Sequence, residues 1–442
     1  MTTGCDNCAG GTPLPEMNGI HVFGELRFPL ERYADALTGW GDSFINMPQE
    51  ISFLAPGKLG ELCDYCGLDG DVRNYLLETA ETIVHDRCLN AYAWHVFYRL
   101  KTPSFSYGAS PAGFSSWPLP EHSLGKRAHA LFLLCSLGAV EASVPKYREE
   151  GYPEKIIKDT FSVVRSSCDS FVRQTGAPGS WPAALSWMRL YLTARLVQLG
   201  RFNYKLMETI PFGVALRNRR DGRKVLLSRV GDAYNSAGWC LQKDDPLAEG
   251  GWTADYRETE TTFSGCAISP CGFALPGTRS YPRDEWEAVL RPGDVMIDMH
   301  IPAGGRMTPE ACRDSFRQAF DFFGAKHGGK FKKVIISHSW IFNTQFEGLL
   351  PESNLAKLMR ECYLFPFVSS GRDGMFFLFG EKCDGDPALL PHGTSVERAM
   401  LGVLEAGNRL RCGGMLYFAE DLERFGTSVY RNSFAEGTMV QS

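Results

Sequence analysis

The spacing of apolar and polar residues changes once along the chain, near Phe212. From Leu30 to about Met207, apolar residues recur every three or four positions, as in Ala128–Val140 and Ile156–Val172. This period predicts amphipathic helices packed around a core. After Phe212, apolar residues alternate with polar ones or form short runs, which predicts strands.

The expected elements after Phe212 have a recognisable order. The predicted strands are Phe212–Leu216, Val225–Arg229, Phe263–Ile268, Val295–Ile301, Val334–Ser339, Leu364–Val368 and Met375–Gly380. Helices are expected at Thr308–Phe323 and Ser353–Cys362, with a short one at Arg283–Leu290. Strands followed by alternating strands and helices predict a mixed sheet with helices on its faces, so the fold class is α/β, or α+β overall.

With 442 residues, the chain is too long for one typical core. We expect a tail at 1–17, a mainly helical domain at 18–205 and a sheet domain at 206–382. A strongly amphipathic helix from Trp187 to Leu199, ended by Gly200, is expected to close the helical domain. Residues 383–442 are predicted to add a helix and a strand that pack on the core.

The segment from Asp294 to Phe367 indicates a ligand as well as a fold. Its first strand leads into Gly304, Gly305, Arg306 and Met307, and Thr308 and Pro309 then suit the N-cap and first position of a helix. Such a loop presents free backbone N–H groups at the positive end of a helix, which suits a phosphate or pyrophosphate. The alternative is that the glycines only turn the chain, since the sequence contains neither G-x-G-x-x-G here nor a P-loop motif.

Several motifs together resemble one bacterial acyltransferase family. They are Asp298–Gly305, Ser339-Trp340, Pro351–Leu355, Trp187–Tyr191, Leu199–Phe202, Gly413–Leu416 and Gly426–Arg431. In that family a helical N-acyltransferase N-terminal domain precedes a domain similar to the GNAT superfamily of N-acyltransferases. The resemblance implies an acyl-CoA-dependent N-acyltransferase that acts on a small-molecule or peptide amine acceptor.

The resemblance also implies where the ligands bind. Acetyl-CoA or another acyl-CoA would place its pyrophosphate on residues 304–308, and the reaction would occur where Val295–Ile301 and Val334–Ser339 splay apart. Ser339, Trp340 and Asn354 are candidate substrate contacts, and Tyr363 is the candidate acid. The Q/R-x-x-G-x-G/A pattern of GNAT enzymes is degenerate here, so the alternative is a catalytically inactive ligand-binding or interaction module.

His300 is the candidate general base. By strand alternation it shares a face with Asp298, and histidine is the side chain best suited to proton transfer near neutral pH. The alternative is a structural histidine held by Asp298 or a backbone carbonyl. A serine hydrolase is a weaker hypothesis, because Ser337 and Ser339 should face away from His338 and no G-x-S-x-G motif is present.

Composition and charge limit the classes of partner and ligand that we expect. The net charge of −5 argues against a nucleic-acid partner, and the basic cluster Arg217–Lys224 surrounds the turn signal Asp221-Gly222, so we expect a hairpin tip. No segment reaches the ~20 apolar residues that span a membrane, which together with a polar N-terminus predicts a cytoplasmic protein. Two C-x-x-C pairs, at Cys5/Cys8 and Cys63/Cys66, raise the alternative of zinc, but their separation matches no common zinc motif and we expect no metal.

Overall fold

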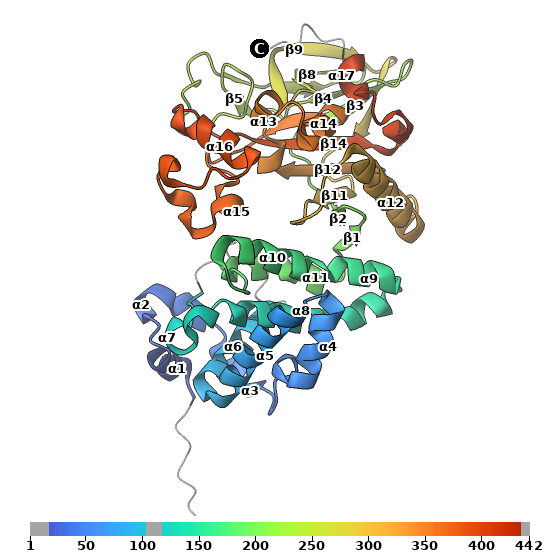
Figure 1. Ribbon diagram of the computed structural model, residues 1–442. Helices are drawn as coiled ribbons and strands as arrows, with labels where there is room; N and C mark the ends of the chain where they lie inside the picture. The colour runs from blue at the N-terminus through green and yellow to red at the C-terminus, as the bar shows by residue number, and fades with distance from the viewer. Residues whose placement is uncertain (1–16, 103–116, 435–442) are drawn as a thin grey trace, which may run out of the picture. The chain divides into compact units, whose positions relative to one another are not determined.

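The computed structural model describes residues 17–102 and 117–434 (Figure 1). The chain divides into two compact units, Met1–Ala194 and Arg195–Ser442. The boundary therefore precedes the predicted one at 205/206, because the strands that start at Val197 and Phe202 belong to the sheet of the second unit. The predicted tail, apart from Met17, lies outside the described residues.

The first unit is helical, as predicted. Its α-helices are α1 (Gly19–Glu25), α2 (Leu30–Tyr33), α3 (Trp40–Ile45), α4 (Pro56–Cys66), α5 (Gly70–His85), α6 (Arg87–Lys101), α7 (Glu121–Leu124), α8 (Ala130–Glu149), α9 (Glu154–Phe161), α10 (Val163–Thr175) and α11 (Leu185–Leu192). The core forms around α8, which is buried along most of its length and packs against α5, α6 and α11.

Helix α8 also explains the longest apolar run of the chain. Among the described residues it is the one helix whose length and composition would allow it to cross a membrane, yet 78% of its most apolar window is buried inside the structure. The ring of Phe53 leaves no room for a side chain at Gly138, and the Cys135 thiol donates to the Ala93 carbonyl on α6. These contacts are those of a core helix in a folded domain.

The second unit contains two large sheets. Its strands are β1 (Val197–Leu199), β2 (Phe202–Met207), β3 (Val214–Asn218), β4 (Lys224–Leu227), β5 (Ala233–Tyr234), β6 (Trp252–Thr253), β7 (Tyr256–Glu258), β8 (Thr262–Ser269), β9 (Phe273–Pro282), β10 (Trp286–Leu290), β11 (Met296–His300), β12 (Val334–Ser339), β13 (Tyr363–Phe367) and β14 (Cys412–Phe418). Its α-helices are α12 (Pro309–His327), α13 (Gln345–Leu349), α14 (Asn354–Glu361), α15 (Met375–Phe379), α16 (Ser395–Glu405) and α17 (Val429–Ser433).

The main sheet has the order β1-β2-β11-β12-β14-β13. Strands β11 and β12 run parallel, whereas the other neighbours in this sheet are antiparallel. Helix α12 covers one face, where Phe316 packs on Tyr417 and the Tyr204 hydroxyl lies 2.8 Å from the Ser315 hydroxyl (Figure 1). Side chains that alternate with Tyr204 and Tyr417 therefore point to the opposite face.

The second sheet has the order β10-β3-β4-β8-β7, with β9 paired to β8. The basic cluster forms the β3–β4 hairpin, as predicted, with Gly222 in the left-handed conformation its turn requires. Lys224 differs from the expectation of an exposed tip. It is buried, and its ammonium lies 2.8 Å from Asp421 and 2.7 Å from Glu420.

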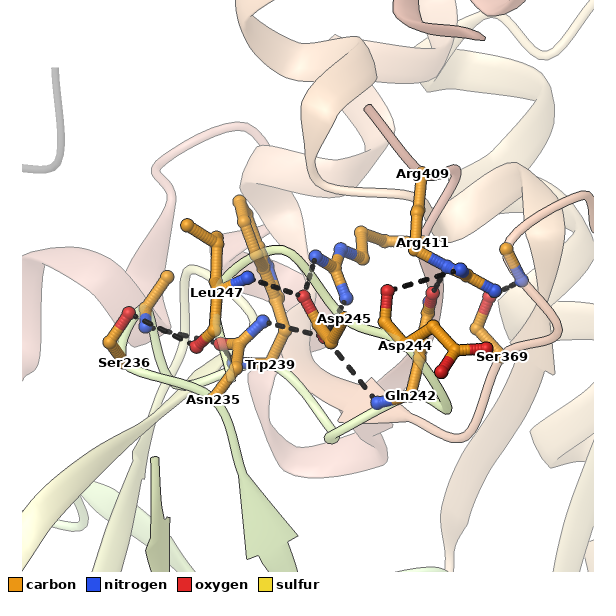
Figure 2. A network of polar contacts seen from close by, with 12 residues as sticks. Asn235, Ser236, Trp239, Gln242, Asp244, Asp245, Leu247, Ser369, Arg409 and Arg411 are labelled. Atoms are coloured by element: carbon orange, nitrogen blue, oxygen red, sulfur yellow. Dashed lines mark hydrogen bonds and ion pairs between the residues drawn. The ribbon is translucent and has the colours of Figure 1, made fainter. Parts of the chain in front are cut away.

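A buried polar network anchors the loop between β5 and β6 (Figure 2). Arg411, just before β14, makes a bidentate ion pair with Asp245 at 2.7 and 3.0 Å, and its guanidinium lies over the Trp239 ring. Burial raises the pKa of Asp245, but Arg411, the Leu247 N–H and Asn235 together hold it well below its ordinary value. The network therefore contains a charged carboxylate with a full set of partners.

Four sequence expectations need correction. Met375–Phe379 is a helix rather than a strand, because a short apolar run does not reveal its period. Trp286–Leu290 is a strand rather than a helix, since pairing with β3 outweighs local propensity. Helix α11 ends at Leu192, and Gly200 instead turns the β1–β2 hairpin. The C-terminal segment does not merely pack on the core, because β14 lies inside the main sheet between β12 and β13.

Candidate active site

Strand β11 carries two polar residues at the end of a buried segment. Asp298 and His300 point to the face opposite α12, as their alternation with Ile297 and Met299 requires. The Nε2 atom of His300 lies 3.0 Å from Oδ2 of Asp298, and their side chains are 24% and 5% exposed, respectively. A buried carboxylate thus holds an imidazole at the strand end, where solvent can reach the ring.

Strand β2 adds a cation to this pair. Lys205 is directly opposite Asp298 in the antiparallel register, and its Nζ lies 3.2 Å from Oδ2 of Asp298. Burial raises the pKa of Asp298, but the interactions with His300 and Lys205 outweigh it and lower the pKa below its ordinary value. Asp298 is therefore a carboxylate at neutral pH and can orient His300.

The pairing of the two parallel strands ends just before His300. Their pairing covers only Ile297 with Ile335 and Asp298 with Ile336, whereas β12 remains paired with β14 as far as Ser339. Backbone pairing between the two strands that were expected to splay apart thus ends at Asp298 and Ile336. His338 lies on β12 just beyond this point, and its ring stacks on Phe367 with centroids 4.3 Å apart.

The loop between β11 and α12 has the geometry of an anion cradle. Gly304 and Gly305 have φ angles of 80° and 66°, which are the left-handed values that glycine favours. Thr308 caps the helix by accepting from the Ala311 N–H at 3.3 Å, and Pro309 follows as predicted. No described residue accepts a hydrogen bond from the backbone N–H groups of residues 304–307. These groups can bind an anion together with the start of α12.

Arg201 contacts the loop of residues 302–305. Its Nη1 donates to the Pro302 carbonyl at 3.1 Å, and its Nε is the nearest atom, at 3.3 Å, to a Cβ placed on Gly305. Burial lowers the pKa of Arg201, but an arginine remains protonated at neutral pH. The loop is therefore fixed against a positive charge, which favours an anionic ligand.

The predicted substrate contacts have local structural roles. The Ser339 hydroxyl accepts from the Ile341 N–H, and Trp340 stacks on Phe377 with the rings 6.1 Å apart. Asn354 begins α14, whose cap is the neighbouring Ser353. Ser339 points away from His338 in the sheet, as expected, so the structure does not bring a serine–histidine pair together here.

Tyr363 does not join His300 and Asp298. It lies on β13, which β14 and β12 separate from β11, and it is fully buried. Its hydroxyl donates to the Ile268 carbonyl at 2.5 Å and accepts from the Leu226 N–H at 3.2 Å. These bonds tie the main sheet to the second sheet, so Tyr363 has a structural role in this arrangement and lies apart from the Asp298–His300 pair.

The cysteines do not form a metal centre in the parts of the chain that the structure describes. Residues 17–102 and 117–434 contain no cluster of three or more His, Cys, Asp or Glu side chains suited to a metal ion. Cys63 and Cys66 lie on α4, and burial raises their thiol pKa values to about 11 and about 12. Cys5 and Cys8 lie outside the described residues.

The sequence reading missed Arg201, Lys205 and the place of His338 beside His300. The sequence does contain a signal for the strand that carries Lys205, because Phe202–Met207 alternates apolar and polar residues as a half-buried strand does. His338 ends an apolar run in the same way as His300. Strands β2, β11 and β12 are neighbours because of the order of strands in the sheet, and no local sequence pattern reveals that order.

Two family models match the chain. The N-acyltransferase N-terminal domain matches residues 57–193, and the GNAT-like C-terminal domain matches residues 196–416, which is half of the chain. The chain belongs to this acyltransferase family. The two matches meet at the boundary between the two compact units.

Solved acyltransferase structures share the fold of this family member. A mutant acyltransferase in complex with octanoyl-CoA has a TM-score of 0.60 at 18% identity, and the match covers 91% of this chain and 99% of that chain. An acyltransferase in complex with decanoyl-CoA and teicoplanin gives the same score and identity, with 90% and 98% covered. A comparison with curated protein sequences gives no match.

Proposed function

We propose that this protein transfers an acyl group from acyl-CoA to the amine of a small-molecule or peptide acceptor. The observation that carries the proposal is the Asp298–His300 pair, which lies where β11 and β12 part and immediately before the loop of residues 304–308. A candidate base, the point where the strand pairing ends and a candidate anion cradle thus follow each other along one strand and its loop.

His300 would act as the general base. With Asp298 holding its ring, it accepts the proton as the amine nitrogen attacks the thioester carbon. The new carbon–nitrogen bond forms, the carbon–sulfur bond breaks, and the thiolate of CoA leaves and takes up a proton. A positioned base typically contributes ~10²–10⁴-fold to the rate.

The cradle would hold the pyrophosphate of the donor. Its backbone N–H groups, the start of α12 and the charge of Arg201 favour a phosphate group. The structural neighbours bind octanoyl-CoA and decanoyl-CoA, which supports an acyl-CoA donor and makes a medium-chain donor the first to test. The neighbour that binds teicoplanin supports a small-molecule acceptor.

The test is release of free CoA thiol from decanoyl-CoA in the presence of a panel of amines, for wild type and His300→Gln. We expect acceptor-dependent release by the wild type and a rate at least about a hundredfold lower for the variant. A thermal shift with decanoyl-CoA provides the binding control, since a ligand that binds the native state raises its melting temperature. Stabilisation without turnover of any amine would instead favour the ligand-binding module. The absence of both stabilisation and turnover would contradict the proposal.

A further inference from the structure

Two histidines lie where the pairing of β11 and β12 ends. Both strands are buried until near their ends, and each then carries a histidine that solvent reaches. The parallel register pairs Ile297 with Ile335 and Asp298 with Ile336, so two residues further it brings His300 level with His338. Both therefore lie on the face opposite α12, one on each side of the point where pairing stops.

The two imidazoles have different surroundings. His300 lies 3.0 Å from the Asp298 carboxylate, whereas the ring of His338 stacks on Phe367 at 22°. Burial lowers the pKa of His338, as do the charges of His300 and Lys205, and only Asp298 opposes them. His338 is therefore a neutral imidazole at neutral pH, with one N–H to donate.

Aromatic side chains pack beside His338, although the residue itself is exposed. On β14, the position beside it is Gly414, and a Cβ there would meet the ring of Phe365 at 2.0 Å. Phe365 and Phe367 on β13 thus form an aromatic wall on this side of His338. Hydrogen bonds to a developing charge become stronger where these rings and a bound ligand together exclude water.

We propose that His338 is a second catalytic residue, which donates a hydrogen bond from its neutral imidazole to the carbonyl oxygen of the acyl thioester. This inference rests on the proposed function. When the amine attacks, the carbonyl electron pair moves onto the oxygen, the amine proton goes to His300, and His338 stabilises the oxyanion without giving up its proton. Collapse restores the carbonyl and expels the thiolate. Neutral histidines can polarise carbonyl groups in this way.

The test is the infrared carbonyl band of bound decanoyl-CoA carrying ¹³C at the thioester carbonyl. We expect the carbonyl band to lie at a lower frequency on the wild-type protein than in a water-free reference solvent. In His338→Ala the band frequency should rise again toward the solvent value. His338→Gln, which keeps an N–H donor, should recover part of the shift. The matched control is His392→Ala, because His392 is an exposed histidine paired with Glu405 far along the chain.

Kinetics supply the second readout. Loss of one oxyanion donor typically costs ~10²–10³-fold in kcat, so His338→Ala should lose about that much while KM for decanoyl-CoA changes little. A wild-type band position in His338→Ala, with decanoyl-CoA still bound, overturns the role of His338 and leaves the proposed function standing. Failure of the wild type to bind decanoyl-CoA removes the proposed function itself.

Discussion

At His300 the chain leaves a buried strand and enters the glycine loop within a few residues. The imidazole remains beside Asp298, which is itself only 5% exposed. A buried carboxylate is costly unless charges and hydrogen bonds compensate it, and here His300 and Lys205 do so. The pair is thus held by its own electrostatics, as the proposed roles of a base and its orienting group require.

Replacing the orienting carboxylate should slow the reaction without removing the ligand. In Asp298→Asn the amide no longer attracts the imidazolium that forms during proton transfer, so we expect kcat to fall by about 10²-fold or more. Binding of CoA, measured by titration calorimetry, should change little, because the cradle lies further along the chain. Asp314→Asn, at an exposed position of α12, is the control and should keep wild-type kcat. Equal rates for the two variants would show that Asp298 has no part in the reaction.

At this scale the sequence indicated the Asp298–His300 pair but not the surroundings of Tyr363. Strand alternation places two polar residues on one face, and that rule needs no tertiary information. Whether a tyrosine hydroxyl reaches a site or bonds to a carbonyl of another sheet depends on the packing of β13 against β8 and β4. The carbonyl of Ile268 is distant in sequence, so no local pattern could reveal it.

At the scale of elements, the cradle depends on a loop with two left-handed glycines followed by a capped helix of 19 residues. Glycine provides the backbone conformation and also the close approach to Arg201. A β-branched side chain at Gly305 would be strained and would project over the N–H groups.

Gly305→Val should therefore weaken CoA binding by about tenfold or more, or about 1.4 kcal/mol. The matched control is Gly328→Val at the other end of α12, where φ is 58° and a Cβ would meet no atom within 4 Å. Both variants carry the same kind of backbone strain, so comparing them isolates the ligand site. Titration calorimetry with CoA measures the effect, and the circular dichroism spectra should stay native. The same CoA affinity in both variants would rule out the cradle.

The elements around the site were predictable because clear sequence signals, such as capping residues and proline, mark where they begin and end. The cap Thr308, Pro309 and the apolar period of α12 fixed that helix, and β11, β12 and α14 followed the expected ranges within a few residues. Strand β10 and helix α15 were not predictable from local pattern, since pairing with β3 and an apolar run without a clear period decided them.

At the scale of the whole molecule, the helical unit contains a buried histidine that couples its stability to pH. The helical unit is built on α8 and contains His95 on α6, whose Nδ1 lies 2.6 Å from the Ser43 hydroxyl and whose Nε2 lies 2.8 Å from the Ala36 carbonyl. Burial lowers the pKa of His95 to about 4, although the bond to Ala36 opposes the shift. The folded state therefore disfavours protonation of this ring.

This shift predicts acid sensitivity of the helical unit. The unfolded chain binds a proton at His95 below about pH 6.5, whereas the folded chain binds one only below about pH 4. The contribution of His95 to stability is therefore full above about pH 6.5 and is lost as the pH falls from about 6.5 to about 4. Two to three pKa units correspond to about 3 kcal/mol. In the full chain, His95→Gln should flatten the fall in melting temperature over this window, and His85→Gln, at an exposed site on α5, should not. A wild-type slope in His95→Gln would show that other groups cause the acid sensitivity.

The two-domain plan could be predicted from the change of period, but its boundary could not be located to within a few residues. The β1–β2 hairpin follows α11 directly, and the amphipathic pattern runs on from the helix into the first strand. The insertion of β14 into the main sheet was also beyond local pattern, because its partners β12 and β13 precede it by many residues.

One measurement tests the central claim most directly: a crystal structure of the protein with decanoyl-CoA. We expect the pyrophosphate on the backbone N–H groups of residues 304–307 beside Arg201. We expect the thioester carbonyl between His300 and His338, where the pairing of β11 and β12 ends. A well-ordered decanoyl-CoA bound elsewhere on the second unit, away from these histidines and the loop, would contradict the proposed function.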